Sequence, residues 1–159
     1  MQKKTEERLE REFLALPQHH IDTSVILEPE NTEEGRACRR YLKRVGKKYR
    51  CVISLPVLGE ILMDILSLET AREKYIALDL VDGIIAESEI AYYTPKTIGK
   101  LLLEIEELDT RVEPTDIEIF ACFVEDGAKT FVTLDSKLIH NMRLEQMFNI
   151  EIKHPGELI

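Results

Sequence analysis

Short β-rich runs alternate with amphipathic helical segments along most of the chain, and this alternation limits the folds open to it. Strands separated by helices of 10 to 16 residues are typical of an α/β fold with a mostly parallel sheet. We predict strands in the run that ends at Asp22 and at 50–53, 89–93, 129–134 and 150–153, with helices at 33–48, 55–66, 70–88, 96–109, 115–127 and 136–148.

The N-terminal segment reads as a separate amphipathic helix. Residues 3–16 place Leu9, Phe13 and Leu16 on one side and stop before Pro17. We expect this helix to pack on the main fold as an extension. The 159-residue length favours one globular domain. The expected division is therefore an extension over 1–17 and a domain over 18–159.

Acidic residues recur where this topology places the carboxyl edge of the sheet. Asp22 ends the first predicted strand, and Glu60 lies in the helix that follows the second. Asp116 lies at the start of the helix that leads into the strand at 129–134, and Asp135 ends that strand. Ligands of parallel α/β sheets bind outside this edge. We therefore expect the four carboxylates to share one site.

Each of these acids taken alone is better explained as a helix cap or a solvated charge, because the chain holds 30 acidic residues. Together, carboxylates brought close would repel one another and raise their pKa values. A divalent cation relieves that repulsion, and ligands that offer only oxygen suit Mg²⁺ or Mn²⁺. This chemistry is typical of phosphodiester hydrolysis.

Three stretches resemble the motifs of the PIN-domain family. They are IDTSVI at 21–26, SLPVLGEIL at 54–62, and TDIEIFACFVEDGAKTFVTLD at 115–135. The similarity runs in the family's order from residue 20 to about residue 153. It implies a three-layer α/β/α sandwich with a short, mostly parallel sheet. It also implies Mg²⁺- or Mn²⁺-dependent cleavage of RNA.

By the same resemblance, individual residues take roles in such a site. The implied metal ligands and catalytic groups are Asp22, Glu60, Asp116 and Asp135. Ser24, Thr133 and Ser136 would be supporting hydroxyls that orient a ligand or a water molecule. Many relatives are VapC-type toxins held by an antitoxin, and others process RNA. A homodimer is expected by family analogy alone.

Two alternatives remain open at this point. Some relatives keep the fold and lose activity, so a catalytically silent module that binds RNA or a protein partner is the second hypothesis. A phosphohydrolase that uses Asp22 as its nucleophile is less favoured. That class has a second aspartate two residues on, where this chain has Ser24.

Taken as a whole, the net charge of −9 argues against a nucleic-acid partner, but the charge is unevenly distributed along the chain. Residues 36–50 carry eight Arg and Lys and no acid. On a helix, that segment would present one basic side. This side is either a solvated surface or a surface that contacts the phosphates of a nucleic acid. The predicted RNA-contacting residues are Arg36, Arg40, Arg44 and Lys47.

The remaining features indicate a cytoplasmic protein with no membrane segment. No apolar run approaches the 18 residues of a spanning helix, and the first 13 residues lack an apolar signal core. The three cysteines form no CxxC pair, which favours a reducing compartment over a disulfide framework or a zinc site.

Overall fold

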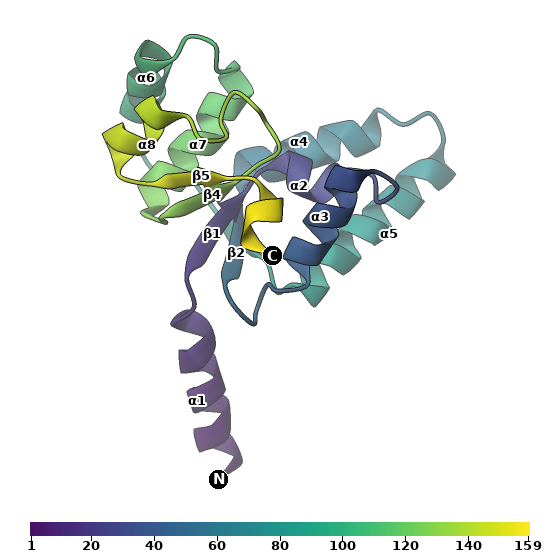
Figure 1. Ribbon diagram of the computed structural model, residues 1–159. Helices are drawn as coiled ribbons and strands as arrows, with labels where there is room; N and C mark the ends of the chain where they lie inside the picture. Colours follow the sequence, from purple (N-terminus) through teal and green to yellow (C-terminus); the bar gives the residue numbers. More distant parts are fainter.

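A five-stranded, fully parallel sheet forms the centre of the molecule. The computed structural model describes residues 1–159, and the sheet has the order β3-β2-β1-β4-β5 (Figure 1). The α/β fold expected from the sequence is confirmed. The strands are β1 (Gln18–Ile21), β2 (Arg50–Ser54), β3 (Ala91–Tyr93), β4 (Thr130–Val132) and β5 (Glu151–Lys153).

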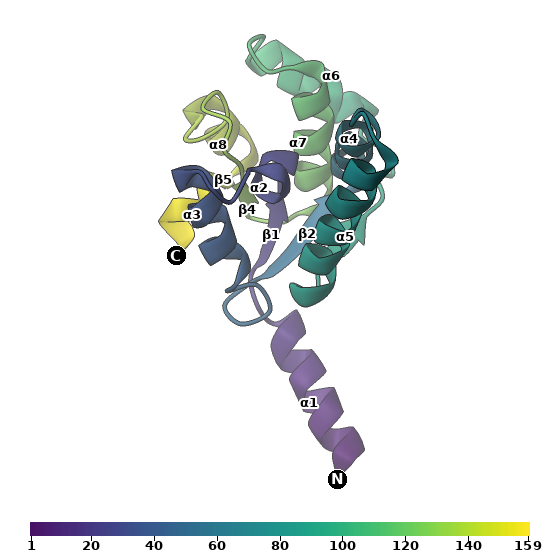
Figure 2. The ribbon, with the colours of Figure 1, turned by 90° about the vertical axis from the view of Figure 1, so that its right-hand side faces the viewer.

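Helices cover both faces of this sheet. In Figure 1, α6, α7 and α8 lie to the left of the strands, while α3 and α5 lie to the right; Figure 2 looks onto the second group. Helix α6 packs on α7, so it forms an outer part of its layer. The helices are α2 (Thr23–Leu27), α3 (Glu33–Leu42), α4 (Leu55–Leu66), α5 (Ala71–Glu87), α6 (Gly99–Leu108), α7 (Pro114–Asp126) and α8 (Met142–Phe148), followed by the 3-10 turn η1 (Pro155–Leu158).

An aromatic cluster joins α7 to the sheet. The Phe120 and Phe123 rings from α7 lie 5.8 and 5.4 Å from the ring of Phe131 in β4, and all three side chains are fully buried. Strands of a parallel sheet are covered on both faces, which is why they read as continuous apolar runs. This packing holds the start of α7 and the ends of β1 and β4 in fixed relative positions.

The boundaries of several helices differ from the sequence-based prediction, and α8 begins at Met142 rather than at residue 136. Helix α3 ends at Leu42 rather than continuing to residue 48. Gly46 adopts a φ of 85°, and its N–H donates to the carbonyl of Tyr49 at 2.7 Å, which closes a turn in place of further helix. Helix α7 begins at Pro114, one residue before the predicted start, because the missing N–H of proline costs nothing at a first helical position.

Helix α1 (Gln2–Leu14) points away from the rest of the molecule (Figures 1 and 2). None of its residues is buried, so the expectation that it packs on the main fold was wrong. Its apolar stripe is narrow, and Leu9 remains 54% exposed. The backbone joins the sheet only beyond the helix, where the N–H of Arg50 donates to the carbonyl of Pro17 at 3.0 Å. The division at residue 17 stays a prediction.

No helix in the structure combines the length and the apolar character that crossing a membrane requires.

Deletion of residues 1–14 tests how far α1 contributes to the fold. Because α1 buries no residue, we expect the free energy of unfolding to change by less than about 0.5 kcal/mol, the range typical of surface changes. Urea unfolding of the full-length and shortened chains measures the difference. A decrease well above about 1 kcal/mol, in the range of a core substitution, would show that α1 packs on the domain.

Candidate metal centre

Three carboxylates from separate elements meet at the carboxyl edge of the sheet. Asp22 follows β1, Glu60 lies in α4, and Asp116 lies in the first turn of α7. One carboxylate oxygen from each lies within 4.8 Å of the other two. The parallel topology brings these elements to the same edge, so the structure unites three of the four acids that the sequence singled out.

Two hydroxyls fix the orientation of Asp22. Its carboxylate Oδ2 accepts hydrogen bonds from Ser24 Oγ at 3.0 Å and from Thr133 Oγ1 at 2.9 Å. Ser24 Oγ in turn accepts from the N–H of Leu134 at 3.2 Å. Asp22 is only 6% exposed, and these bonds tie its carboxylate to the end of β4. Two of the three expected hydroxyls therefore contact a site carboxylate.

Glu60 offers an oxygen that nothing in the protein satisfies. Its Oε1 is buried and accepts no hydrogen bond. The Oγ1 of Thr23, which is also buried, makes none either. Buried acceptors without a partner are rare in native structures, because desolvation without a bond is costly. An unpaired carboxylate oxygen beside two other acids is a suitable ligand for a cation.

Asp135 lies at the border of this cluster. Its backbone N–H donates to Thr133 Oγ1 at 3.0 Å, and its Oδ1 accepts from the N–H of Lys137 at 2.9 Å. It does not belong to the tight group of three, yet its charge acts on both Asp22 and Asp116. Ser136, the third expected hydroxyl, is exposed and makes no hydrogen bond to these carboxylates.

Burial and mutual repulsion raise the pKa values of the three central acids. Burial is the larger cause at Asp22, where the charge of Asp135 adds to it and hydrogen bonds from Thr133 and Ser24 oppose it. Burial and the charge of Asp22 raise the pKa of Glu60. Burial, followed by the charges of Asp22 and Asp135, raises the pKa of Asp116 to about 7. A divalent cation would offset this repulsion, and a set of oxygen ligands fits Mg²⁺ or Mn²⁺.

Comparisons with known proteins bear on the fold. No protein-family model and no curated protein matches the chain. Several solved structures, in contrast, do match this chain. A chain of FitAcB from Neisseria gonorrhoeae aligns with a TM-score of 0.62 and 14% identity over 86% of this chain and 97% of that one.

Two further structures contain the same arrangement. A chain of VapBC2 from Rickettsia felis, solved with a DNA fragment from their promoter, has a TM-score of 0.62 and 18% identity over 86% of this chain and 98% of that one. A chain of DNA-bound VapBC from Salmonella typhimurium has a TM-score of 0.56 and 19% identity over 88% and 99%. The chain has a PIN-type fold. The fold expected from the sequence motifs is thereby confirmed.

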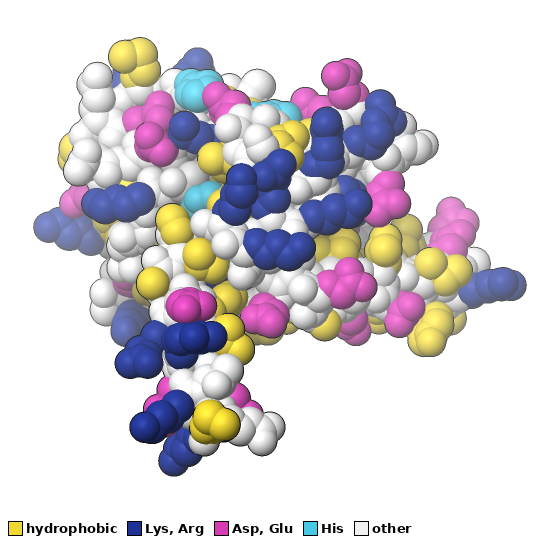
Figure 3. All heavy atoms as spheres, turned by 60° about the horizontal axis from the view of Figure 1, so that its bottom comes forward, with side chains coloured by type: hydrophobic (Ala, Val, Ile, Leu, Met, Phe, Trp, Pro, Cys, Tyr) yellow, Lys and Arg dark blue, Asp and Glu magenta, His cyan; other side chains and the backbone are white.

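The basic segment of this PIN-type fold lines a groove between α3 and α5. The groove encloses about 970 Å³ and does not include any of the four site acids. Lys and Arg side chains gather over the face drawn in Figure 3, with acidic side chains at their border. The basic lining residues are Arg36, Arg39, Arg40, Lys43 and Lys47, and the acidic ones are Glu30, Asp79 and Glu87.

Arg44 does not belong with the other predicted RNA-contacting residues. It is half-buried and absent from the groove, and its charge acts on Tyr49. The expectation that Arg36, Arg40, Arg44 and Lys47 share one side assumed a continuous helix. Because α3 ends at Leu42, the spacing fails beyond that residue.

Sequence reasoning missed Thr23 as a member of the site. The signal was its position directly after Asp22, within the PIN-like stretch at 21–26. Its buried hydroxyl lies close enough to Glu60 to lower the pKa of that carboxyl.

The raised pKa of Asp116 predicts a pH effect on the stability of the metal-free protein. The pKa of this carboxyl group is about 7 in the folded protein, above its ordinary value of 3.8. Its contribution to stability is therefore fully present below pH 3.8 and is lost as the pH rises through 7. Asp116→Asn removes the buried charge. We expect the variant to be more stable than the wild type at pH 8 by about 1–2 kcal/mol, after allowance for solvent screening, and the gain to shrink towards pH 4.

Urea unfolding in EDTA at several pH values measures this difference. Asp82→Asn, which removes an exposed carboxylate from α5, serves as the matched control and should show little pH-dependent gain. An Asp116→Asn variant that is less stable than the wild type at pH 8 would contradict the repulsion inferred for this cluster.

Proposed function

We propose that this protein is a Mg²⁺- or Mn²⁺-dependent endoribonuclease that hydrolyses RNA phosphodiester bonds at the Asp22–Glu60–Asp116 cluster. The observation that carries the proposal is the convergence of these three carboxylates within 4.8 Å, with Oε1 of Glu60 buried and unpaired. A bound cation relieves the repulsion between like charges held this close, and the sequence motifs that bring them together resemble those of PIN-type nucleases.

Different residues of the proposed site have different roles. Asp22, Glu60 and Asp116 would hold the cation, and Ser24 and Thr133 keep the carboxylate of Asp22 aimed at it. Asp135 lies beside this group, where its carboxylate can orient an attacking water molecule and accept its proton. Ser136 is exposed next to Asp135, within reach of a bound water or substrate. When bound, the cation supplies positive charge to the phosphate and to the leaving oxygen.

RNA as the substrate rests on the resemblance to PIN-domain nucleases. The α3–α5 groove supports a polyanionic ligand, because its basic side chains outnumber the acidic ones that face them. We propose Arg36, Arg40 and Lys47 as contacts to the RNA backbone, with Arg44 outside the groove. Such contacts fix the position of an RNA strand, while the carboxylate cluster would cleave it.

A protein partner is a further part of the proposal. The structures that this chain resembles are those of VapBC and FitAB assemblies, several of them with bound DNA. By that similarity we propose a partner of the antitoxin kind, and a homodimer by family analogy alone.

A catalytically silent module that binds RNA or a protein remains the second candidate. The observation that favours it is the groove itself, which lies apart from the carboxylates and would serve binding without any cleavage.

Cleavage of RNA in the presence of Mn²⁺ tests the first proposal against the second. We expect the wild type to cut a mixed single-stranded RNA with Mn²⁺ and not with EDTA. Asp22→Asn and Asp135→Asn should each slow cleavage by more than about a hundredfold, since removing a ligand or a proton acceptor costs more than disturbing an outer contact. Circular dichroism checks that both variants remain folded.

The control for this experiment is again Asp82→Asn, which makes the same carboxylate-to-amide change at an exposed position of α5 outside the cluster. It should cut RNA at the wild-type rate. RNA binding without cleavage by the wild type would favour the silent module. Equal cleavage rates for the wild type and either site variant would rule out the four-carboxylate mechanism.

The groove makes a separate prediction about RNA affinity. The double substitution Arg36→Gln and Arg40→Gln removes two exposed cations that line it. We expect weaker RNA binding and a shallower dependence of log K on log salt, by about 0.7 for each single-strand phosphate that the variant no longer neutralises. Fluorescence anisotropy at several salt concentrations measures both.

Lys3→Gln with Lys4→Gln provides the matched control, because it removes the same charge from α1. It should leave the salt dependence unchanged. A similar decrease of slope in both double variants would show that only net charge matters and that RNA does not bind in the groove.

A further inference from the structure

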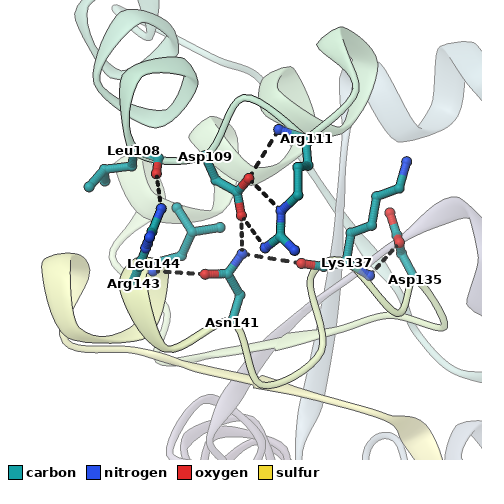
Figure 4. Close-up of polar contacts among 8 residues, drawn as sticks. All are labelled: Leu108, Asp109, Arg111, Asp135, Lys137, Asn141, Arg143 and Leu144. Atoms are coloured by element: carbon teal, nitrogen blue, oxygen red, sulfur yellow. Dashed lines mark hydrogen bonds and ion pairs between the residues drawn. The ribbon is translucent and has the colours of Figure 1, made fainter.

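A buried polar network links two segments that carry site acids. Asp109 caps the end of α6 and is 4% exposed. Its Oδ1 accepts from the N–H and the Nε of Arg111, both at 3.0 Å. Its Oδ2 accepts from Nη2 of Arg111 at 2.8 Å and from Nδ2 of Asn141 at 3.0 Å (Figure 4). The pairing with Arg111 holds the pKa of Asp109 far below its usual range, so this carboxylate stays charged.

Asn141 has two separate hydrogen-bonding roles. Its Oδ1 accepts from the N–H of Leu144 at 3.3 Å and so caps the start of α8. Its Nδ2 donates both to Asp109 and to the carbonyl of Lys137, the latter at 3.1 Å. One side chain therefore joins the turn after β4 to the loop between α6 and α7, as Figure 4 shows.

Each of the two joined segments leads directly to a site acid. On one side, the loop after Asp109 runs into α7, whose first turn carries Asp116. On the other, the N–H of Lys137 donates to Oδ1 of Asp135 at 2.9 Å. The carbonyl of Asp135 accepts from the N–H groups of the next two turn residues, Leu138 and Ile139, at 3.0 Å each.

Three polar side-chain contacts join these segments, and only one of them is buried. Lys137 Nζ lies 3.6 Å from Oε1 of Glu113, and both side chains are exposed. Arg143 donates to the carbonyl of Leu108 at 3.5 Å, again at the surface. Exposed pairs of this kind constrain geometry weakly because water competes for them. Of these three polar contacts, only the bond from Asn141 to Asp109 is shielded from water, so it adds to the packing of α7 on β4 in setting the distance between the segments.

We propose that Asp109 and Asn141 are positioning residues that hold Asp116, a proposed ligand of the divalent cation, at a fixed separation from Asp135 beside it. Neither touches the site; they act through the loop before α7 and the turn after β4. The inference rests on the proposed metal-dependent function and adds to it two residues outside the three PIN-like motifs. The cation-binding geometry would then be built before any cation arrives.

The test measures Mn²⁺ binding to the full-length chain by isothermal titration calorimetry. Asn141→Asp is the informative variant, because aspartate still caps α8 but lacks the Nδ2 donor and places a second carboxylate against Asp109. We expect Mn²⁺ affinity to fall by about tenfold or more, the range typical when the support around metal ligands is removed. In the Asn141→Asp background, Asp109→Asn removes the facing charge and should recover part of that affinity.

Thr70→Ala is the control for reduced stability. It removes the hydrogen bond from the N–H of Glu73 to Thr70 Oγ1, 3.1 Å long, at the start of α5. Urea unfolding shows how much stability each variant loses, and Mn²⁺ affinity is compared under conditions where all are folded. Thr70→Ala should bind Mn²⁺ as tightly as the wild type.

The outcomes separate the two proposals. If the wild type binds Mn²⁺ and Asn141→Asp binds it equally well, the network is structural only and the positioning role is overturned, while the proposed function stands. If Asp109→Asn recovers no affinity in the Asn141→Asp background, the interaction between the two residues is not the cause of the weaker binding, which also overturns the positioning role. A wild type that neither binds Mn²⁺ nor cuts RNA overturns both proposals.

Discussion

Repulsion among Asp22, Glu60 and Asp116 is the interaction around which the carboxyl edge of the sheet is organised. Three acids within 4.8 Å of one another destabilise the fold unless a proton or a cation intervenes, and burial, together with the charges of neighbouring acids, raises the pKa of each. The buried aromatic packing between α7 and β4 opposes this repulsion, because it anchors the helix that carries Asp116 to the sheet.

The surrounding polar contacts keep the acids in place rather than neutralising them. Thr133 and Ser24 donate to Asp22, and no Lys or Arg pairs with the central three carboxylates in the structure. A cluster meant only for stability would be expected to contain such a cation of its own. The bulk charge of −9 therefore includes acids that suit a bound cation, and the basic groove between α3 and α5 lies elsewhere on the molecule.

Much of the candidate site was predictable because it follows from topology. Once the strands are taken as parallel, Asp22, Glu60 and Asp116 must come to one edge, and the short apolar runs at 50–53 and 129–134 are enough to place them. The end of helix α7 at Gly127 was predictable as well. Glycine at a helix end commonly adopts the left-handed conformation that Gly127 has, with a φ of 80°.

The features that escaped prediction depend on contacts distant in sequence. Asn141 reaches Asp109 across 32 residues, and no local pattern marks that pair. Helix α3 stops at Leu42 because Tyr49 closes a turn and donates from its hydroxyl to the carbonyl of Tyr41, which helical periodicity alone does not reveal. The exposure of α1 was missed because an apolar stripe indicates that a helix has a face to bury, without showing that anything covers it.

The most direct measurement is anomalous diffraction from crystals of the full-length protein soaked in MnCl₂. We predict one strong Mn²⁺ peak bounded by carboxylate oxygens of Asp22, Glu60 and Asp116, with Oε1 of Glu60 among its ligands. A saturated crystal with no peak at that position, and with Oε1 of Glu60 hydrogen-bonded to a protein donor instead, would contradict the assignment of this cluster as a metal centre.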